Sequence, residues 1–224
     1  ERGARRAPAP YPTARSTQVM EYAPNGTLHS VVTQHQKLGR HIDESLMWRY
    51  CIQILAGLHA IHSRRVVHRD IKPHNIFLGA NDTVKIGDFG VSRLLSGSRD
   101  LATTVVGSPG YLAPELCYGE PYNEKADIWA LGVTMAELCA LKHPFGGAGS
   151  QAALVMKIMR AAPPPLPASY TPQLGRLLIC CMQRQAAHRP SALQLLAVPT
   201  VREYAALFGL DDYLPRLPAG SSTA

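Results

Sequence analysis

The most constraining feature of the sequence is a polar segment followed by a short β-hairpin. Residues 68–75 read His-Arg-Asp-Ile-Lys-Pro-His-Asn, and two runs of strand-forming residues, 76–78 and 84–86, follow with turn residues between them. Asp88-Phe89-Gly90 comes directly after the second run. Because a hairpin returns the chain to its starting point, Asp88 is expected beside Asn75.

The residue types in this segment define a particular chemistry. The hairpin lets two carboxylates, an amide and an ammonium group converge: Asp70, Asp88, Asn75 and Lys72. A carboxylate and an amide oxygen suit Mg²⁺, a second carboxylate can accept a hydroxyl proton, and a lysine can neutralise a moving phosphoryl group. An isolated loop Asp or Asn is more simply explained as a turn residue, but that explanation does not account for the four together.

Composition favours a globular chain with a core. Of the 224 residues 46% are hydrophobic and 17% charged, while 18 glycines and 18 prolines predict loops around a mainly helical body. The net charge of +7 is compatible with anionic partners, but no basic stripe with interleaved aromatic residues supports nucleic-acid binding. No apolar stretch is long enough for a membrane span, so no membrane partner is expected.

The cysteines indicate a reducing compartment. The five are odd in number, lie in apolar stretches and show no Cys-x-x-Cys spacing, so we expect buried, reduced thiols in an intracellular protein.

The chain divides into three parts. Residues 1–18 form an Arg/Pro-rich head that we expect to be disordered, and residues 201–224 form a tail, partly helical and then disordered. Between them, Val19–Tyr22 is strand-like, 89–124 is loop-like, and apolar periodicity predicts helices over 43–62, around 128–138, 150–160, 171–183 and 191–197. Tyr111 and Tyr118 are expected to cover the core.

Three ordered motifs resemble the protein kinase superfamily. They are the His-Arg-Asp segment with its lysine and asparagine, Asp-Phe-Gly at 88–90, and Ala-Pro-Glu at 113–115. Lys72 and the Gly-Ser-Pro at 107–109 resemble the serine/threonine type, and residues 77–78, 122–129 and 137–141 are similar to the NIMA-related kinases. The resemblance implies an α+β kinase fold, represented here by a mainly α-helical large lobe with a short β-hairpin at the active site.

The resemblance also implies roles for individual residues. Asp70 is the catalytic base, Lys72 contacts the γ-phosphate of ATP, and Asn75 and Asp88 hold Mg²⁺. The remaining roles are nucleotide contacts by Met20, Glu21, Ala23 and Phe77, regulation by Arg69, by Thr104 as a phosphorylation site and by Ser108, and structural support from Asp127 and a buried Glu115–Arg189 ion pair. The implied partners are proteins with Ser or Thr acceptors. The implied location is the cytoplasm, with nuclear or cytoskeletal placement also compatible, and the oligomeric state stays open.

One part of the expected pattern is missing from the sequence. Protein kinases place a small lobe, with a glycine-rich loop and a lysine, over the phosphates. Residues 1–18 contain one glycine and no lysine, so we expect residues 19–200 to hold the hinge and large lobe without the small lobe. Two hypotheses follow: a fragment of an active serine/threonine kinase, or a truncated pseudokinase that acts as a protein-binding module.

Overall fold

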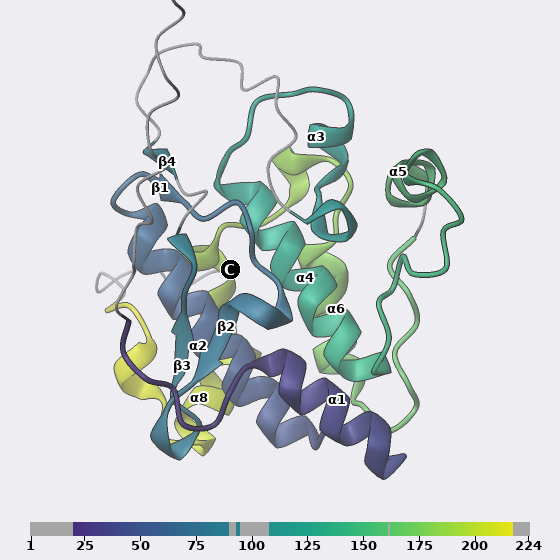
Figure 1. Ribbon diagram of the computed structural model, residues 1–224. Coiled ribbons are helices and arrows are strands. Elements are labelled where there is room, and N and C mark those ends of the chain that lie inside the picture. Colours follow the sequence, from purple (N-terminus) through teal and green to yellow (C-terminus); the bar gives the residue numbers. More distant parts are fainter. Residues whose placement is uncertain (1–19, 90–92, 95–107, 161, 217–224) are drawn as a thin grey trace, which may run out of the picture.

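The computed structural model of the chain describes residues 20–89, 93–94, 108–160 and 162–216. This part is mainly helical with two small antiparallel sheets, as expected for the fold (Figure 1). The predicted head, Thr104, Gly90 and the last residues of the tail lie outside the described residues.

The helices and strands follow one another in a simple order. The helices are α1 (Leu28–Leu38), α2 (Glu44–His62), α3 (Pro114–Cys117), α4 (Glu124–Ala140), α5 (Gln151–Arg160), α6 (Pro172–Cys181), α7 (Ala192–Leu196) and α8 (Pro199–Leu207). The strands are β1 (Val66–Val67), β2 (Ile76–Leu78), β3 (Val84–Ile86) and β4 (Arg93–Leu94). β2 pairs with β3 and β1 with β4, both antiparallel, so the predicted hairpin is confirmed.

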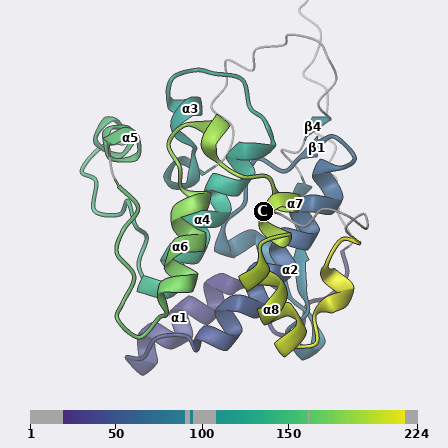
Figure 2. The same cartoon turned by 180° about the vertical axis from the view of Figure 1, so that it is seen from behind.

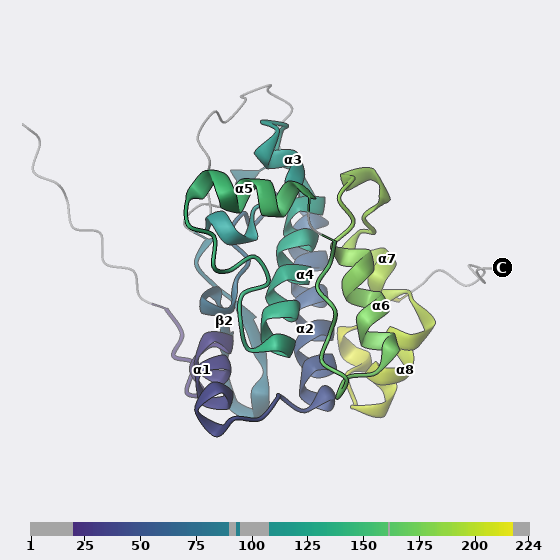
Figure 3. The same ribbon diagram turned by 90° about the vertical axis from the view of Figure 1, so that its right-hand side faces the viewer.

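Helix α4 is the centre of the fold. It is buried along almost its whole length and contacts α2 and α6, which fits a sequence that is apolar on most faces (Figure 3). Gly132 makes the contact with α6 close: a β-carbon there would lie 2.6 Å from Met182 Cγ and 2.9 Å from Cys181 Cβ. Any larger residue would push the two helices apart.

The main core lies between α2 and the C-terminal helices. α2 packs against α7 and α8, and the ring of Trp48 stacks on that of Tyr204 with centroids 4.2 Å apart (Figure 2). α8 crosses the boundary expected at residue 200 and buries Val201 and Ala205 completely.

A second core beneath α3 contains a buried ion pair. Arg189 and Glu115 are 1% and 4% exposed, and two guanidinium nitrogens reach the two carboxylate oxygens at 2.8 and 3.1 Å. Arg189 also donates to the carbonyl oxygens of Lys125 and Gln183 and lies over the ring of Trp129. The arginine therefore has more partners than the glutamate.

Several expectations need correction. Met20–Tyr22 form no strand, and Met20 and Tyr22 are 60% and 82% exposed. Tyr118 does not cover the core, because it is 64% exposed, and Cys180 is an exposed thiol although all five cysteines are free.

Helix α1 was not expected. Its sequence, LHSVVTQHQKL, is polar overall, and its apolar residues Leu28, Val31 and Val32 share one face over little more than one turn. The helix is started instead by a capping box between Thr27 and Ser30 and anchored by buried Leu28 and Val32.

The ion pair predicts a specific order of stabilities. Arg189→Ala is expected to lower the free energy of unfolding by about 3–5 kcal/mol, since it leaves a buried carboxylate and two buried carbonyl groups without their partner. Glu115→Ala should cost less, because Arg189 keeps its carbonyl acceptors. Urea unfolding followed by circular dichroism measures both, and a larger loss for Glu115→Ala would contradict this explanation.

Candidate active site

The buried carboxylate of Asp127 holds the loop that carries the predicted catalytic residues. Asp127 is fully buried in the first turn of α4 and accepts hydrogen bonds from the backbone N–H groups of His68 and Arg69, both at 2.9 Å. The hydroxyl of Tyr122 donates to the same carboxylate at 2.8 Å, and Nε2 of His62 lies 2.9 Å from it. Four groups from three separate segments of the chain therefore meet at one side chain.

This anchor supports an unfavourable backbone conformation. Arg69 has φ 73°, in the left-handed region that costs a non-glycine residue about 1–3 kcal/mol. Its N–H donates to Asp127 and its guanidinium lies over the Tyr122 ring, 5.3 Å from the centroid. The turn at Arg69 lies between strand β1 and Asp70. It changes the direction of the chain so that Asp70 lies in the site.

Asp70 is surrounded by donors. Lys72 Nζ lies 2.6 Å from Oδ2 and the amide nitrogen of Asn75 lies 2.9 Å from the same oxygen, while the backbone N–H of Ser108 donates to Oδ1 at 3.0 Å. Partial burial acts to raise the pKa of the Asp70 carboxyl, but the hydrogen bonds from Lys72, Ser108 and Asn75 and the lysine charge outweigh it, so this pKa lies below its ordinary value. Asp70 is therefore ionised at neutral pH.

Lys72 connects the two sides of the site. Its ammonium donates to Asp70 and, at 2.7 Å, to the hydroxyl of Ser108. Ser108 lies far along the chain from Lys72, so this contact joins the catalytic loop to the segment that precedes α3. Ser108 thus contacts both Asp70, through its backbone N–H, and Lys72, through its hydroxyl.

The hairpin places Asp88 next to this group. The N–H of Gly87 donates to the Asn75 carbonyl at 2.9 Å, just beyond the Ile76–Ile86 pair that closes the ladder. Gly87 has no room for a side chain, because a β-carbon would lie 2.7 Å from the Phe77 ring. Its carbonyl also lies 2.9 Å from Nε2 of the buried His68, so His68 fixes the end of the hairpin as well.

The donor set fits a hard cation. The amide nitrogen of Asn75 is turned toward Asp70, which directs the amide oxygen the other way, and Asp88 follows Gly87, whose backbone N–H donates to the Asn75 carbonyl. Such oxygen ligands suit Mg²⁺, which keeps several of its waters. Within the described ranges no group of three or more His, Cys, Asp or Glu side chains could hold a metal ion.

The residues expected to contact a nucleotide base lie beside the hairpin. The backbone of Asn25 and Gly26 hydrogen-bonds to Leu78, and Thr27 bridges to Phe77, so residues 25–27 run along β2. Glu21 forms an ion pair with Lys85 on β3. Of the residues expected to contact the nucleotide, Phe77 lies on β2 and Glu21 contacts β3, whereas Glu115 and Arg189 lie in the second core.

Tyr122 and His62 are site-supporting residues that the sequence did not reveal. Their contacts with Asp127 span 5 and 65 positions in the chain. Tyr111 was expected only to cover the core, but its hydroxyl donates to the buried Glu137 of α4. Only the position of Tyr122, shortly before Asp127, offered a sequence signal.

Because Asp127 holds the loop at His68 and Arg69, replacing its carboxylate is expected to loosen that loop locally. Asp127→Asn brings amide hydrogens against donor N–H groups and should speed amide exchange at His68 and Arg69, with a loss of about 2–4 kcal/mol in unfolding free energy. Tyr122→Phe removes one hydrogen bond and should cost only about 1 kcal/mol.

Hydrogen exchange read by mass spectrometry measures this, with the exposed Tyr118→Phe as the matched control. Unchanged exchange at His68 and Arg69 in Asp127→Asn would contradict the anchor.

Comparison with known proteins agrees with this geometry. The protein kinase domain family model matches residues 11–201. The chain is 47% identical over 178 residues to serine/threonine-protein kinase Nek3 of Mus musculus, covering 80% of this chain and 34% of that protein. It is 43% identical over 182 residues to Nek5 of Homo sapiens, covering 81% and 25% of the two chains.

A fungal relative extends the same pattern. The G2-specific protein kinase nimA of Emericella nidulans is 34% identical over 210 residues, covering 82% of this chain and 30% of that protein. The chain thus spans about a third or less of the length of these curated relatives. The chain belongs to the protein kinase family, of the serine/threonine type, and is similar to the NIMA-related kinases.

Proposed function

We propose that this chain supplies the catalytic loop and metal ligands of a serine/threonine protein kinase that uses Mg-ATP. The observation that carries the proposal is the group around Asp70, where Lys72, Asn75 and Ser108 converge on one carboxylate. Bound Mg-ATP would supply the electrophilic γ-phosphoryl group and the metal charge. The substrates would be proteins with exposed Ser or Thr hydroxyls.

Asp70 would act on the substrate hydroxyl. Its carboxylate is ionised and fixed by three donors, so it can orient the hydroxyl and accept its proton as the oxygen–phosphorus bond forms. The bond from phosphorus to the ADP oxygen breaks in the same displacement. The low pKa of Asp70 suits a group that orients first and takes the proton late.

The negative charge of the ATP phosphates would be neutralised by Lys72 and by Mg²⁺ held on Asn75 and Asp88. Lys72 already bridges Asp70 and Ser108, so its ammonium is held where a transferred phosphoryl group would pass. Asn75 and Asp88 would hold Mg²⁺ through an amide oxygen and a carboxylate. Ser108 would hold the substrate segment close to Asp70, and Arg69 would pair with a phosphate on Thr104.

The nucleotide base would sit at the edge where residues 20–27 meet β2. Met20, Glu21, Ala23 and Phe77 would line that position, and the exposure of Met20 leaves an apolar surface for the base or for a covering lobe. The free cysteines support a reducing, cytoplasmic location. Within the described part of the chain, no helix has both the length and the apolar character needed to cross a membrane.

The role of Asp70 predicts a separation of binding from turnover. Asp70→Asn should lower phosphoryl transfer to a Ser/Thr peptide by about 10²- to 10⁴-fold, since the proton acceptor is lost. Affinity for Mg-ATP should stay close to wild type, because the metal ligands remain. The complete natural protein is assayed by labelled-phosphate transfer and by calorimetry, with the exposed Asp212→Asn as matched control.

The same two measurements separate the proposal from the alternative. Loss of transfer and Mg-ATP binding together in Asp70→Asn, with unchanged thermal unfolding, would contradict the assigned role. A wild-type protein that binds no Mg-ATP at its verified mass would favour the pseudokinase that works as a protein-binding module.

A further inference from the structure

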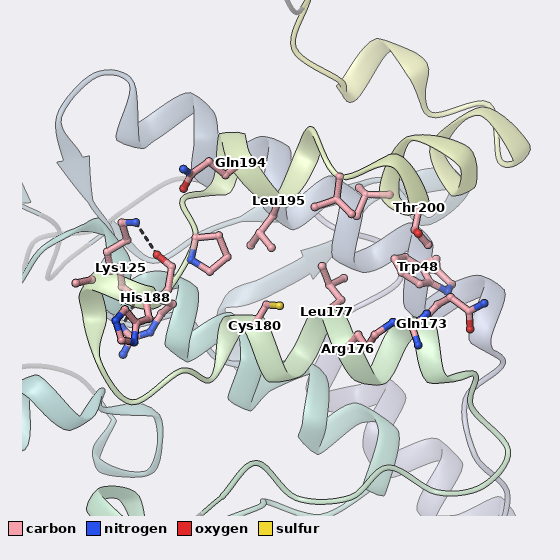
Figure 4. A pocket seen from close by; sticks show the side chains of 15 residues that line it. Trp48, Lys125, Gln173, Arg176, Leu177, Cys180, His188, Gln194, Leu195 and Thr200 are labelled. Atoms are coloured by element: carbon pink, nitrogen blue, oxygen red, sulfur yellow. Dashed lines mark hydrogen bonds between the residues drawn. The ribbon is translucent and has the colours of Figure 1, made fainter. Parts of the chain in front are cut away.

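A groove lies on the face of the molecule away from the catalytic loop. It runs between α6 on one wall and α7 with the start of α8 on the other, and has a volume of about 630 Å³ (Figure 4). Figure 2 brings these helices to the front, whereas the β2–β3 hairpin is at the front of Figure 1. Neither Asp70 nor Asp88 lines the groove, so it is separate from the site of transfer.

The floor of the groove is apolar. Leu177 of α6 and Leu195 of α7 face each other across it, and Trp48 closes one end (Figure 4). Val198, at the start of α8, adds a side chain that is 36% exposed. An apolar side chain placed here would be removed from water on several sides.

The walls carry groups that suit a peptide backbone. Gln173 on α6 and Thr200 on α8 line the groove, and among the described residues their side chains have no hydrogen-bond partner. Gln194 on the opposite wall uses its amide oxygen for the Ser191 N–H and keeps its NH₂ group for another acceptor. Donors and acceptors on both walls match the alternating N–H and C=O groups of an extended chain.

The charge of the lining has one sign. Lys125, Arg176 and Arg189 line the groove, and none of the residues that line it is Asp or Glu. Arg189 is committed to Glu115, and Lys125 Nζ donates to the Arg189 carbonyl at 2.6 Å. Arg176 is exposed and, in the part of the chain that is described, has no acidic partner. The complementary ligand is therefore acidic.

We propose that this groove is a docking site for an acidic peptide segment of a partner protein, with a leucine or phenylalanine between its carboxylates. The apolar side chain lies on Leu177, Leu195 and Val198, and a carboxylate pairs with Arg176. The glutamines and Thr200 hydrogen-bond the peptide backbone. Binding here does not depend on catalysis, and it holds a partner on the protein without covering Asp70.

Two pools of short fluorescein-labelled peptides test the proposal by fluorescence anisotropy. In the first, a leucine or phenylalanine is flanked by aspartate or glutamate among random residues, and in the second lysine or arginine replaces the acids. The acidic pool should bind the full chain at least about tenfold more tightly than the basic pool. Arg176→Glu should weaken this binding about tenfold or more, while the exposed Arg40→Glu, the same charge change outside the groove, should not.

A second pair of variants isolates the apolar contact. Val198 is the N-cap of α8, where serine is favoured, so Val198→Ser removes groove surface while keeping the helix start. Val198→Ser should weaken binding of the acidic pool about fourfold for each CH₂ group that no longer becomes buried when the peptide binds. Leu207→Ser, at a side chain that is 71% exposed and outside the groove, is the matched control.

Three results would overturn the proposal. They are equal binding of the two pools, acidic-pool binding that Arg176→Glu leaves intact, and displacement of the acidic pool by a random single-stranded oligonucleotide at equal charge concentration. The last would mean that the groove attracts any polyanion. Because every readout is binding, failure here leaves the phosphoryl-transfer proposal untouched, and loss of transfer in Asp70→Asn leaves this one untouched.

Discussion

The catalytic arrangement depends on one buried carboxylate. Asp127 accepts the N–H groups of His68 and Arg69 and is also contacted by Tyr122 and His62, so α4, the end of α2 and the catalytic loop are fixed to each other through a single side chain. Burying a charge costs free energy unless it is well hydrogen-bonded, and four partners satisfy this requirement. The left-handed turn at Arg69, and hence the direction of Asp70, follows from that anchor.

Above this anchor the charges of the site are arranged in advance. Asp70 and Lys72 neutralise one another while Ser108 and Asn75 fix their positions, so the proposed phosphoryl transfer would need little reorganisation of these side chains. The groove between α6 and α7 differs in kind, because its cations have no carboxylate among the lining residues. The charges around Asp70 are thus neutralised within the site, whereas the positive charge of the groove is left for the proposed acidic partner.

The sequence predicted the parts of the site that depend on local geometry. Asp70, Lys72 and Asn75 are close in the chain, and a hairpin necessarily returns Asp88 to them, so spacing was enough. Tyr122 and His62 could not be found in this way, because their roles depend on how α2 and the segment before α4 pack together. Helix α1 was missed because a capping box and two buried side chains, rather than a long apolar stripe, stabilise it. The predicted burial of Cys180 was wrong because burial depends on how helices pack. Cys180 lies in an apolar run of the sequence, but its side chain lines the groove and is exposed.

The most direct test of the central claim is a crystal structure of the complete natural protein with Mg²⁺ and a non-hydrolysable ATP analogue. We expect metal density bound by the amide oxygen of Asn75 and the carboxylate of Asp88, with Lys72 directed at the terminal phosphate and Asp70 free of metal. A nucleotide bound elsewhere, or a metal held without Asn75 and Asp88, would contradict it.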